Sequence, residues 1–549
     1  MKKQFLFTLL ILFSVISLQA QETPVFTRQD TLRGSITPER EWWDLTYYHL
    51  DIAVDPEEKT IEGKNTIQYQ VLEPQQRMQI DLQPPMQIHK ITQNGEGLSF
   101  EQDGNAWFVE LEKPQEKGEV NSVVVHYGGK PQVSENPPWS GGITWTTDSK
   151  GRPFIASSNQ GDGASLWWPN KDHMYDEVDS MLISVTVPEE LMDVSNGRLR
   201  GVEHHKKKDT KTYHWYVDNP INNYGVNINI ADYVHFDGVY KGEKGKLTLD
   251  YYVLPENLKK AKEQFKEVPR MLEAFEHWFG PYPWYKDGYK LVEAPYLGME
   301  HQSSVTYGNG YQNGYKGRDW SLTGQGMKFD FIIVHESGHE WFANNITYKD
   351  AADMWIHESF TAYSENLFLE YFFGKEAGSE YVRGTRSAIQ NDRPIIGIYD
   401  VNYSGSSDMY FKGANMLHTL RQLVNDDEKW RSILRGMNKE FWHQTVTTEQ
   451  IENYLSERTG MDLSDFFDQY LRTIHIPTLE YRFLNGTLAY RWSNVVDGFD
   501  MPVQVSINGV EKWLEPKEGK WSVLKEVPAD ASLKVDPDFY VSYMDLTVE

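Results

Sequence analysis

The sequence predicts a multidomain α+β fold with a β-rich N-terminal domain, a mainly helical central domain and a small C-terminal β-sandwich. The length of 549 residues exceeds what one hydrophobic core usually serves. Short alternating apolar and polar runs occur near both ends of the chain, which is typical of strands. Between Lys328 and Tyr470 the apolar residues instead recur at three- and four-residue spacing, which is typical of helices.

Residues 1–20 predict a secretory signal peptide. Lys2 and Lys3 precede an apolar run from Phe5 to Leu18, and Ala20 offers a small residue for cleavage. The run is about 14 residues, whereas a membrane-spanning helix needs about 20. We therefore expect an exported protein, periplasmic or secreted and soluble, with no membrane span after processing.

The domain limits follow from changes in pattern along the mature chain. Strand-like runs such as YYHLDIAVD and SVVVHYGG continue to about Tyr240, and helical spacing begins after Leu254-Pro255. Alternation returns after Pro477 in runs such as TLEYRFL and PVQVSIN. The predicted units are the signal peptide at 1–20, the N-terminal domain at 21–240, the central domain at 241–475 and the C-terminal domain at 476–549.

Charge and cysteine content exclude several classes of partner and fold. The formal net charge of −26 argues against nucleic acid or an anionic membrane as partner, because both need basic patches. The chain contains no cysteine, so disulfides cannot hold the exported fold together. No feature of the sequence specifies an oligomeric state.

The strongest motif is the run His335-Glu336-Ser337-Gly338-His339 inside a helical stretch. Residues four apart lie on one face of a helix, so both imidazoles can reach one zinc ion. Glu336 lies about 100° around the helix from His335 and can contact a water molecule at the metal. This arrangement is typical of a zinc hydrolase whose general base is built into the motif.

A catalytic zinc needs a third protein ligand, and Glu358 is the candidate. The metzincin pattern requires a glycine and a third histidine at positions that here hold Phe342 and Asn345, so that class is excluded. Glu358 lies nineteen residues after His339, on a second predicted helix, at a spacing that resembles the gluzincins. His357 is adjacent, but neighbouring side chains point about 100° apart, so only one of the two can face the metal.

Four separated motifs resemble the aminopeptidase N family, which also includes leukotriene A hydrolase. They are the strand opening TYYHLDIAVDPEEKTIEG, the FGPYPW turn from Phe279 to Trp284, the HExxH motif with its distant glutamate, and Tyr410-Phe411-Lys412-Gly413. The resemblance implies a saddle-like N-terminal domain, a thermolysin-like catalytic domain and one zinc ion held by His335, His339 and Glu358.

The resemblance also implies the substrate-binding residues. The run Leu297-Gly298-Met299-Glu300-His301 is similar to the family's Gly-x-Met-Glu-Asn motif, whose glutamate holds the free α-ammonium group of the substrate. Leu297 and His301 depart from that motif and affect the detailed fit of the first subsite. Gly298, Met299 and Glu300 are thus expected to bind substrate.

Two further roles rest on the resemblance. Gln160, in the run Ser157-Ser158-Asn159-Gln160, resembles the family glutamine that lines the first side-chain pocket. Tyr410 corresponds to the tyrosine that donates a hydrogen bond to the oxyanion, whereas Tyr399 and Tyr403 match the motif less well.

The expected function is therefore a zinc aminopeptidase that acts on peptides with a free N-terminus, with Glu336 as general base. Two alternatives stay open: a zinc endopeptidase of the thermolysin type, and a catalytically silent peptide-binding scaffold on the same fold. Epoxide hydrolysis, as in the leukotriene-hydrolase branch, is disfavoured because the C-terminal segment predicts strands where that branch has a helical domain.

Overall fold

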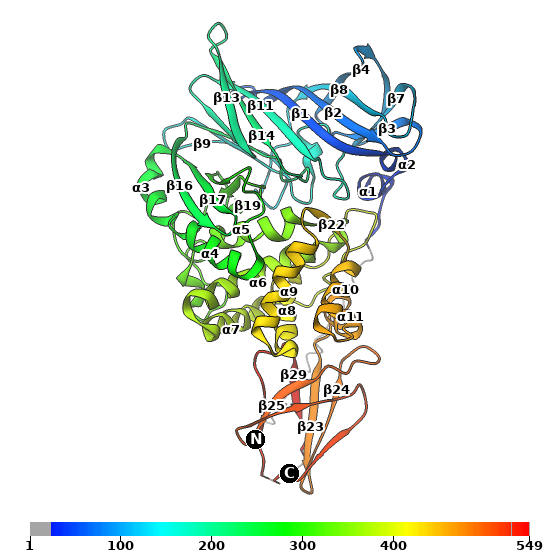
Figure 1. Cartoon of the computed structure of the whole chain (residues 1–549), viewed down its shortest axis with the longest axis vertical. Helices are drawn as coiled ribbons and strands as arrows, with labels where there is room; N and C mark the ends of the chain where they lie inside the picture. The colour runs from blue at the N-terminus through cyan, green and yellow to red at the C-terminus, as the bar shows by residue number, and fades with distance from the viewer. Residues whose placement is uncertain (1–23, 529, 548–549) are drawn as a thin grey trace, which may run out of the picture.

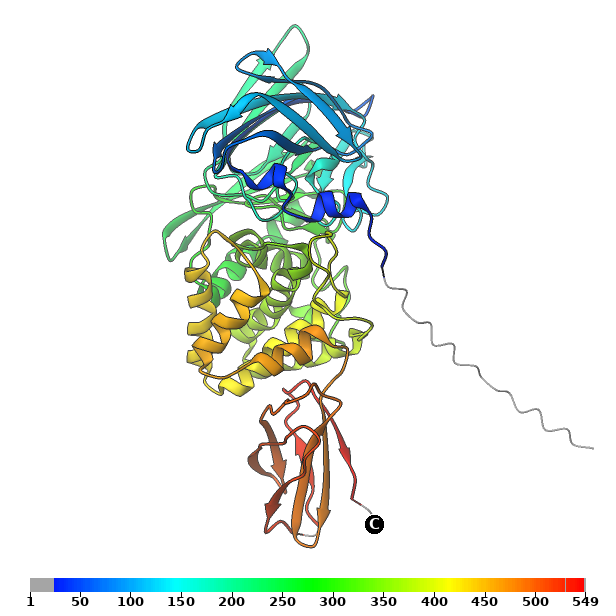
Figure 2. The same ribbon diagram turned by 90° about the vertical axis from the view of Figure 1, so that its right-hand side faces the viewer.

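The computed structural model describes residues 24–528 and 530–547. Three regions follow one another along the longest axis, with strands at one end, helices in the middle and a small group of strands at the other end (Figure 1). The same stacking is visible after a quarter turn (Figure 2). The predicted multidomain α+β class is confirmed, while the signal peptide predicted at residues 1–20 lies outside the described residues.

The N-terminal region is built on an eight-stranded sheet of order β13-β14-β11-β1-β2-β8-β4-β5. Its central strand β1 (Trp43–Asp55) pairs antiparallel with β2 (Thr60–Val71) and parallel with β11 (Ser180–Pro188). Alternate residues of β1 are buried, as its alternating sequence predicts. The other strands are β4 (Gln87–Gln93), β5 (Glu96–Gly97), β8 (Val120–Gly129), β13 (Arg198–His205) and β14 (Thr210–Val217).

Two smaller sheets complete this region. One has the order β3-β7-β6 and the other β12-β15-β10-β9. The second sheet matters for function, because β10 (Pro153–Ser158) leads directly into Asn159 and Gln160. The remaining elements are α1 (Arg28–Gly34), α2 (Pro38–Glu41), β3 (Gln75–Asp81), β6 (Ser99–Asp103), β7 (Ala106–Gln115), β9 (Gly142–Thr147), η1 (Ala164–Leu166), β12 (Met192–Ser195) and β15 (Ile228–Ala231).

A five-stranded sheet of order β16-β17-β18-β20-β19 introduces the helical region. Its strands are β16 (Val234–Gly242), β17 (Gly245–Val253), β18 (Tyr289–Glu293), β19 (Gly298–Met299) and β20 (Val305–Tyr307). The expected boundary between residues 240 and 241 falls inside β16, because β16 pairs with β17 along its whole length. The limits of the three domains otherwise stay predictions.

The helices of the central region pack around α6 (Trp355–Phe373), which is buried continuously from Trp355 to Leu369. A helix that is buried on every side is typical of the centre of a domain, and the buried residues of α6 include the polar Glu358 and Glu365. The helices that pack directly against it are α4 (Glu267–Phe279), α5 (Phe331–Gly338), α7 (Lys375–Gly384) and α8 (Phe411–Val424). The region also contains α3 (Leu258–Gln264), α9 (Asp427–Glu440), α10 (Thr448–Thr459) and α11 (Ser464–Arg472). Short elements connect them: η2 (Pro255–Asn257), η3 (Gln325–Lys328), η4 (Glu340–Asn345), β21 (Ile346–Tyr348), η5 (Ala351–Asp353), η6 (Thr385–Ala388), η7 (Ser407–Met409) and β22 (Gln444–Val446).

The helix that carries the HExxH motif is shorter than its sequence pattern predicts. Its first turn is capped by Asp330, whose carboxylate accepts from the backbone N–H groups of Ile332 and Ile333. The α-helix ends at Gly338, and the backbone leaves helical geometry at Phe342, with φ −126° and ψ 76°. The reason is local: the carbonyl of Phe342 lies 3.0 Å from Nδ1 of His339.

The C-terminal region consists of two sheets, of order β27-β24-β23-β29 and β26-β25-β28. Apolar residues from both sheets, including Leu479, Trp492 and Val503, are fully buried in the same cluster. The strands are β23 (Thr478–Leu484), β24 (Thr487–Ser493), β25 (Val503–Ile507), β26 (Val510–Leu514), β27 (Ser522–Lys525), β28 (Leu533–Val535) and β29 (Ser542–Asp545). In the described part of the chain, no helix has the length and apolar character needed to cross a membrane.

Asp538 fastens the C-terminal region to the helical region. Its carboxylate lies 2.9 Å from Nη1 of Arg383 and accepts a hydrogen bond from the Ser379 hydroxyl at 3.3 Å. Both partners are on α7. Burial works against ionisation of Asp538, but His418 and Arg383 lower the pKa of this carboxyl to about 2.

We predict that Asp538→Asn lowers stability by about 2 kcal/mol at pH 7, because a depressed pKa stabilises the fold above the unfolded value of about 4. This contribution is lost as the pH falls toward the folded value of about 2. Melting of the metal-free protein at pH 7 and pH 3 measures it, and the difference from wild type should shrink at pH 3. Asp500→Asn is the control, since its pair with Lys517 is exposed. Equal effects of the two substitutions at pH 7 would contradict the prediction.

Candidate metal centre and active site

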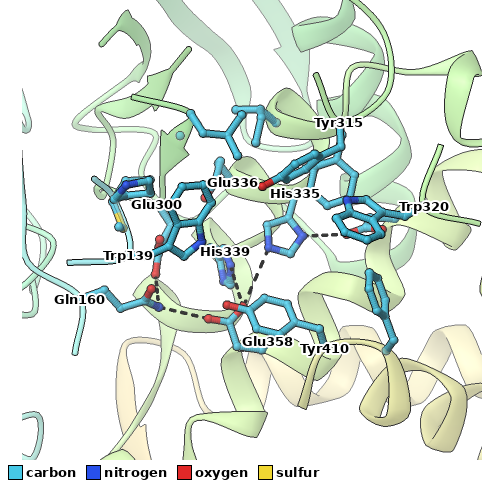
Figure 3. A pocket seen from close by; sticks show the side chains of 18 residues that line it. Trp139, Gln160, Glu300, Tyr315, Trp320, His335, Glu336, His339, Glu358 and Tyr410 are labelled. Atoms are coloured by element: carbon cyan, nitrogen blue, oxygen red, sulfur yellow. Dashed lines mark hydrogen bonds and ion pairs between the residues drawn. The ribbon is translucent and has the colours of Figure 1, made fainter. Parts of the chain in front are cut away.

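The site is a cavity of about 310 Å³ where the N-terminal and helical regions meet. Gln160 and Trp139 reach it from the N-terminal region, and Glu300 reaches it from the end of β19. Residues of α5 and α6 form its floor, and Tyr410 closes another side (Figure 3). Segments that are far apart in the sequence therefore contribute to one pocket.

His335, His339 and Glu358 converge on one point of this pocket (Figure 3). Oε2 of Glu358 lies 3.9 Å from Nε2 of His335 and 3.4 Å from Nε2 of His339. The ligand atoms of all three residues lie within 4.8 Å of one another, and the three side chains are buried. The four-residue spacing on α5 and the first turns of α6 therefore bring together the three predicted ligands.

The Nδ1 atom of each histidine, which faces away from the metal point, already has a hydrogen-bond partner. Nδ1 of His335 lies 2.7 Å from Oε1 of Glu365, and Nδ1 of His339 lies 3.0 Å from the Phe342 carbonyl. Because Nδ1 donates to these oxygens, Nε2 of both rings keeps its lone pair for a metal. Tyr381 donates to the second oxygen of Glu365, which fixes that carboxylate in turn.

The Glu358 carboxylate shows that the residues fit a metal ion. Oε1 accepts from the Gln160 amide at 3.1 Å, whereas Oε2 is buried and has no hydrogen-bond partner among the described residues. A buried carboxylate oxygen without a partner is costly, so a cation at this point would satisfy it. Two imidazole nitrogens and one carboxylate oxygen are a donor set typical of catalytic zinc, and they leave one position open.

His357, the neighbour of Glu358, faces away from the metal point. Its Nε2 accepts the backbone N–H of Tyr348 at 2.9 Å, and the two rings are 4.2 Å apart. Of the two adjacent residues, only Glu358 therefore faces the metal point, as expected.

Glu336 lies on α5 next to the ligands and lines the pocket. Burial raises the pKa of Glu336 to about 7, which suits a general base at neutral pH. Gly298 makes room for this side chain: a Cβ atom there would lie 2.9 Å from Oε1 of Glu336 and 2.7 Å from Cγ2 of Ile332. The glycine is thus required by close approach of β19 to α5.

Glu300 is held in the pocket by three hydrogen bonds. Gln160 donates to its Oε1 at 2.6 Å and Tyr224 donates to the same oxygen at 3.2 Å, while Asn344 donates to its backbone carbonyl at 2.9 Å. Gln160 therefore bridges Glu300 and Glu358. Met299 lies beside Glu300 and packs against Ala156, Ala294 and Tyr296.

Tyr410 stands over the ring of His335, with 6.0 Å between the ring centroids. Burial and the nearby carboxylates, first that of Glu358, raise the pKa of Tyr410 well above its ordinary value. Its phenol therefore keeps its proton and can donate a hydrogen bond. Tyr399 instead donates to Asp353, and Tyr403 packs against Phe26.

Sequence reasoning missed several residues that complete the site. Glu365 follows Glu358 by two helical turns, so the seven-residue spacing on one helix face was a usable signal. Tyr224 and Trp139 come from turns and Asn344 from η4, and none of the three gave a local signal.

The buried Glu340 forms hydrogen bonds with several segments around the site. Its carboxylate accepts hydrogen bonds at 3.1 Å from Tyr282, 2.7 Å from Trp284, 2.9 Å from the backbone of Ser303 and 3.1 Å from Asn344. Because Asn344 also binds the Glu300 carbonyl, this network links the FGPYPW turn to the pocket.

Comparisons with known proteins identify the central region. Residues 263–470 match the peptidase family M1 domain. Leukotriene A-4 hydrolase of Xenopus laevis is 24% identical over 76% of this chain and 68% of its own length. Aminopeptidase N of Lactococcus lactis is 27% identical, but the match covers 29% of this chain and only 20% of that protein.

The fold agrees with a solved structure of an M1 zinc metallopeptidase from Deinococcus radiodurans, a mutant bound to a Tyr-Ser-Ala substrate. The TM-score is 0.67 at 22% sequence identity, and the similarity covers 81% of this chain and 98% of the other. Together with the donor set of His335, His339 and Glu358, the family implies zinc as the metal.

We predict that Glu365→Gln weakens zinc binding by about 10- to 100-fold, because the neutral amide no longer supports the Nδ1–H of His335. Competition with a chromophoric chelator measures the affinity directly. Tyr381→Phe is the matched control: it removes only the hydroxyl that donates to the other oxygen of Glu365, so its loss should be smaller. Unchanged zinc affinity in Glu365→Gln would refute this role.

Proposed function

Because residues 263–470 match the peptidase family M1 domain, we propose that the chain is a zinc-dependent aminopeptidase acting on peptides with a free N-terminus. One observation carries the proposal. A carboxylate oxygen of Glu300, a carboxylate oxygen of Glu336 and a ring nitrogen of the metal ligand His339 lie within 4.8 Å of one another. A fixed negative charge so close to the metal ligands leaves room for about one residue before the bond to be cut.

The charge of Glu300 decides between exopeptidase and endopeptidase. A free α-ammonium group placed there gains a charge-assisted hydrogen bond with the buried carboxylate. An internal peptide bond would instead leave that carboxylate buried without a positive partner, which costs several kcal/mol. The side-chain oxygen of Gln160 can accept a further hydrogen bond from the ammonium group, because its amide nitrogen already donates to Glu300 and Glu358.

The other residues of the pocket support a hydrolytic reaction. Zinc, when bound, supplies a Lewis acid that polarises the scissile carbonyl and makes a water molecule more acidic. Glu336 accepts the proton of the attacking water and returns it to the leaving amine, for which a pKa of about 7 is suited. Tyr410 keeps its proton and donates a hydrogen bond to the developing oxyanion, an interaction worth roughly 3 kcal/mol.

The first test presents one peptide with a free and with an acetylated N-terminus, each with and without a zinc chelator. We expect rapid, chelator-sensitive cleavage of the free form only, because acetylation removes the charge that Glu300 binds. Stepwise release of N-terminal residues is followed by mass spectrometry. Equal cleavage of both forms would favour the thermolysin-type endopeptidase, and cleavage of neither would favour the silent scaffold.

Two isosteric substitutions separate the roles of the carboxylates. Glu336→Gln should lower kcat about 1,000-fold with little change in KM, because it removes the base and no ground-state contact. Glu300→Gln should lower kcat/KM about 100-fold for free peptides and abolish the preference for a free over an acetylated N-terminus. A Glu300→Gln enzyme that kept this preference would place the ammonium site elsewhere.

We also propose that the protein is exported, on the basis of residues 1–20 alone. Expression of the full chain with its own leader should give a mature protein that begins at Gln21. N-terminal sequencing of the purified protein measures this, with a leaderless variant as control. Retention of Met1 in the exported fraction would refute cleavage.

A further inference from the structure

A second cavity, of about 760 Å³, adjoins the active-site pocket. Tyr315 and Trp320 line both cavities, so they form the wall between them. The second cavity is made by one segment of chain, residues 315–324, which we call the rim loop. Apart from Tyr315 and Trp320, the residues of the rim loop that line this cavity do not line the active-site pocket, and the loop has no role in the chemistry described above.

The rim loop lies on the far side of the metal ligands from Glu300. In Figure 3, Glu300 and Gln160 stand on one side, the three ligands in the middle and Trp320 on the other side. Once Glu300 holds the N-terminus and the first peptide bond lies at the metal, the rest of the peptide has to leave away from Glu300. That direction leads past Trp320 to the second cavity.

The surface of the rim loop is apolar and exposed. Trp320 is 42% exposed and Leu322 is 79% exposed, although residues of this kind are usually covered. Trp320 also contacts the ring of Phe411, which lines the active-site pocket, with centroids 6.2 Å apart. The exposed apolar surface is therefore continuous with the pocket.

The rim loop is held in shape by its own hydrogen bonds. Asp319 accepts from the backbone and hydroxyl of Ser321 at 2.8 and 2.7 Å and from the backbone of Gly324 at 2.6 Å. Tyr315 and Arg318 form a backbone bridge, with N–H···O distances of 2.8 and 3.0 Å. The loop thus presents a preformed surface, and the Asp319 carboxylate is occupied within it.

Positive charge is placed on this surface. Arg318 is exposed and lines the second cavity, and among the described residues its guanidinium has no ion pair, hydrogen bond or ring contact. The ammonium group of Lys316 lies 5.6 Å from the centre of the ring of Trp139, which lines the active-site pocket. The inner pocket, by contrast, holds Glu300, Glu336 and Glu358.

We propose that the rim loop binds the leaving part of the substrate and that Arg318 pairs with a carboxylate there. The preferred substrates are then short peptides that carry a positive N-terminus and a negative charge a few residues further on, with an apolar side chain against Trp320. This inference rests on the proposed aminopeptidase function. The carboxylates of the inner pocket face the positive N-terminus of such a peptide, and Arg318 at the rim faces its negative charge, so the charges of site and peptide are complementary.

The experiment uses peptides of three to five residues that are identical except for a C-terminal carboxylate or amide. For the wild type we expect kcat/KM to be about 3- to 10-fold higher for the carboxylate at one best length, mostly through KM, as for a partly exposed ion pair. In Arg318→Gln this acid-to-amide ratio should fall to about 1. In Arg318→Glu it should fall below 1.

A second set of peptides shows whether Arg318 pairs with the C-terminal carboxylate or with an acidic side chain of the substrate. Peptide amides with Glu or Gln at each position after the first show whether an acidic side chain replaces the C-terminus. Arg482→Gln is the control, because it makes the same charge change on an exposed arginine of the C-terminal region. Among the described residues, the Arg482 guanidinium has no ion pair, and it contacts the Trp521 ring. The acid-to-amide ratio should be unaltered in this control, and zinc content and melting temperature verify the fold of each variant.

Equal cleavage of acid and amide peptides by the wild type at every length would overturn the inference and leave the aminopeptidase function standing. The same holds if the ratio is unchanged in Arg318→Gln, or if it falls equally in Arg482→Gln. Failure to cleave any free peptide, including the amides, would overturn both the inference and the proposed function.

Discussion

The concentration of buried carboxylates around two histidines is the constraint on which the site depends. Glu300, Glu336 and Glu358 share one pocket, and Glu365 stands directly behind His335. Removing several negative charges from water is strongly unfavourable unless cations and hydrogen bonds compensate them. A divalent ion between the Nε2 atoms and the Glu358 oxygen that lacks a hydrogen bond would provide that compensation, so without metal this group of carboxylates is electrostatically strained.

Much of the surrounding structure follows from this need. Gln160 donates to two of the carboxylates at once, and Gly298 leaves out the side chain that would displace Glu336. The backbone departs from the helix at Phe342 because its carbonyl bonds the His339 ring. The α-helix of the active site is therefore short because the carbonyl of Phe342 orients His339. The sequence did not indicate this, because its helix-like apolar spacing continues to Ala343.

The sequence was informative wherever function depends on spacing within one element. The four-residue interval between His335 and His339 and the position of Glu358 required only helix geometry, and the structure brings these side chains together. Contacts between distant segments carried no such signal: the bond from Tyr224 to Glu300 spans 76 residues, and the approach of Lys316 to Trp139 joins two regions. The predicted domain boundary at residue 240 shows the same limit. It falls inside β16, and the pairing of β16 with β17, which composition does not reveal, assigns this strand to the five-stranded sheet.

The helix α7 connects two parts of the molecule that have separate tasks. Tyr381 on one of its faces supports Glu365 and hence His335, while Ser379 and Arg383 bind Asp538 of the C-terminal β-sandwich. Removal of the C-terminal region, by proteolysis between α11 and β23, would take away the contact of Asp538 with α7. Because α7 also carries Tyr381, which donates to Glu365 behind His335, the small C-terminal region supports a metal ligand at a distance, although the three ligands lie elsewhere.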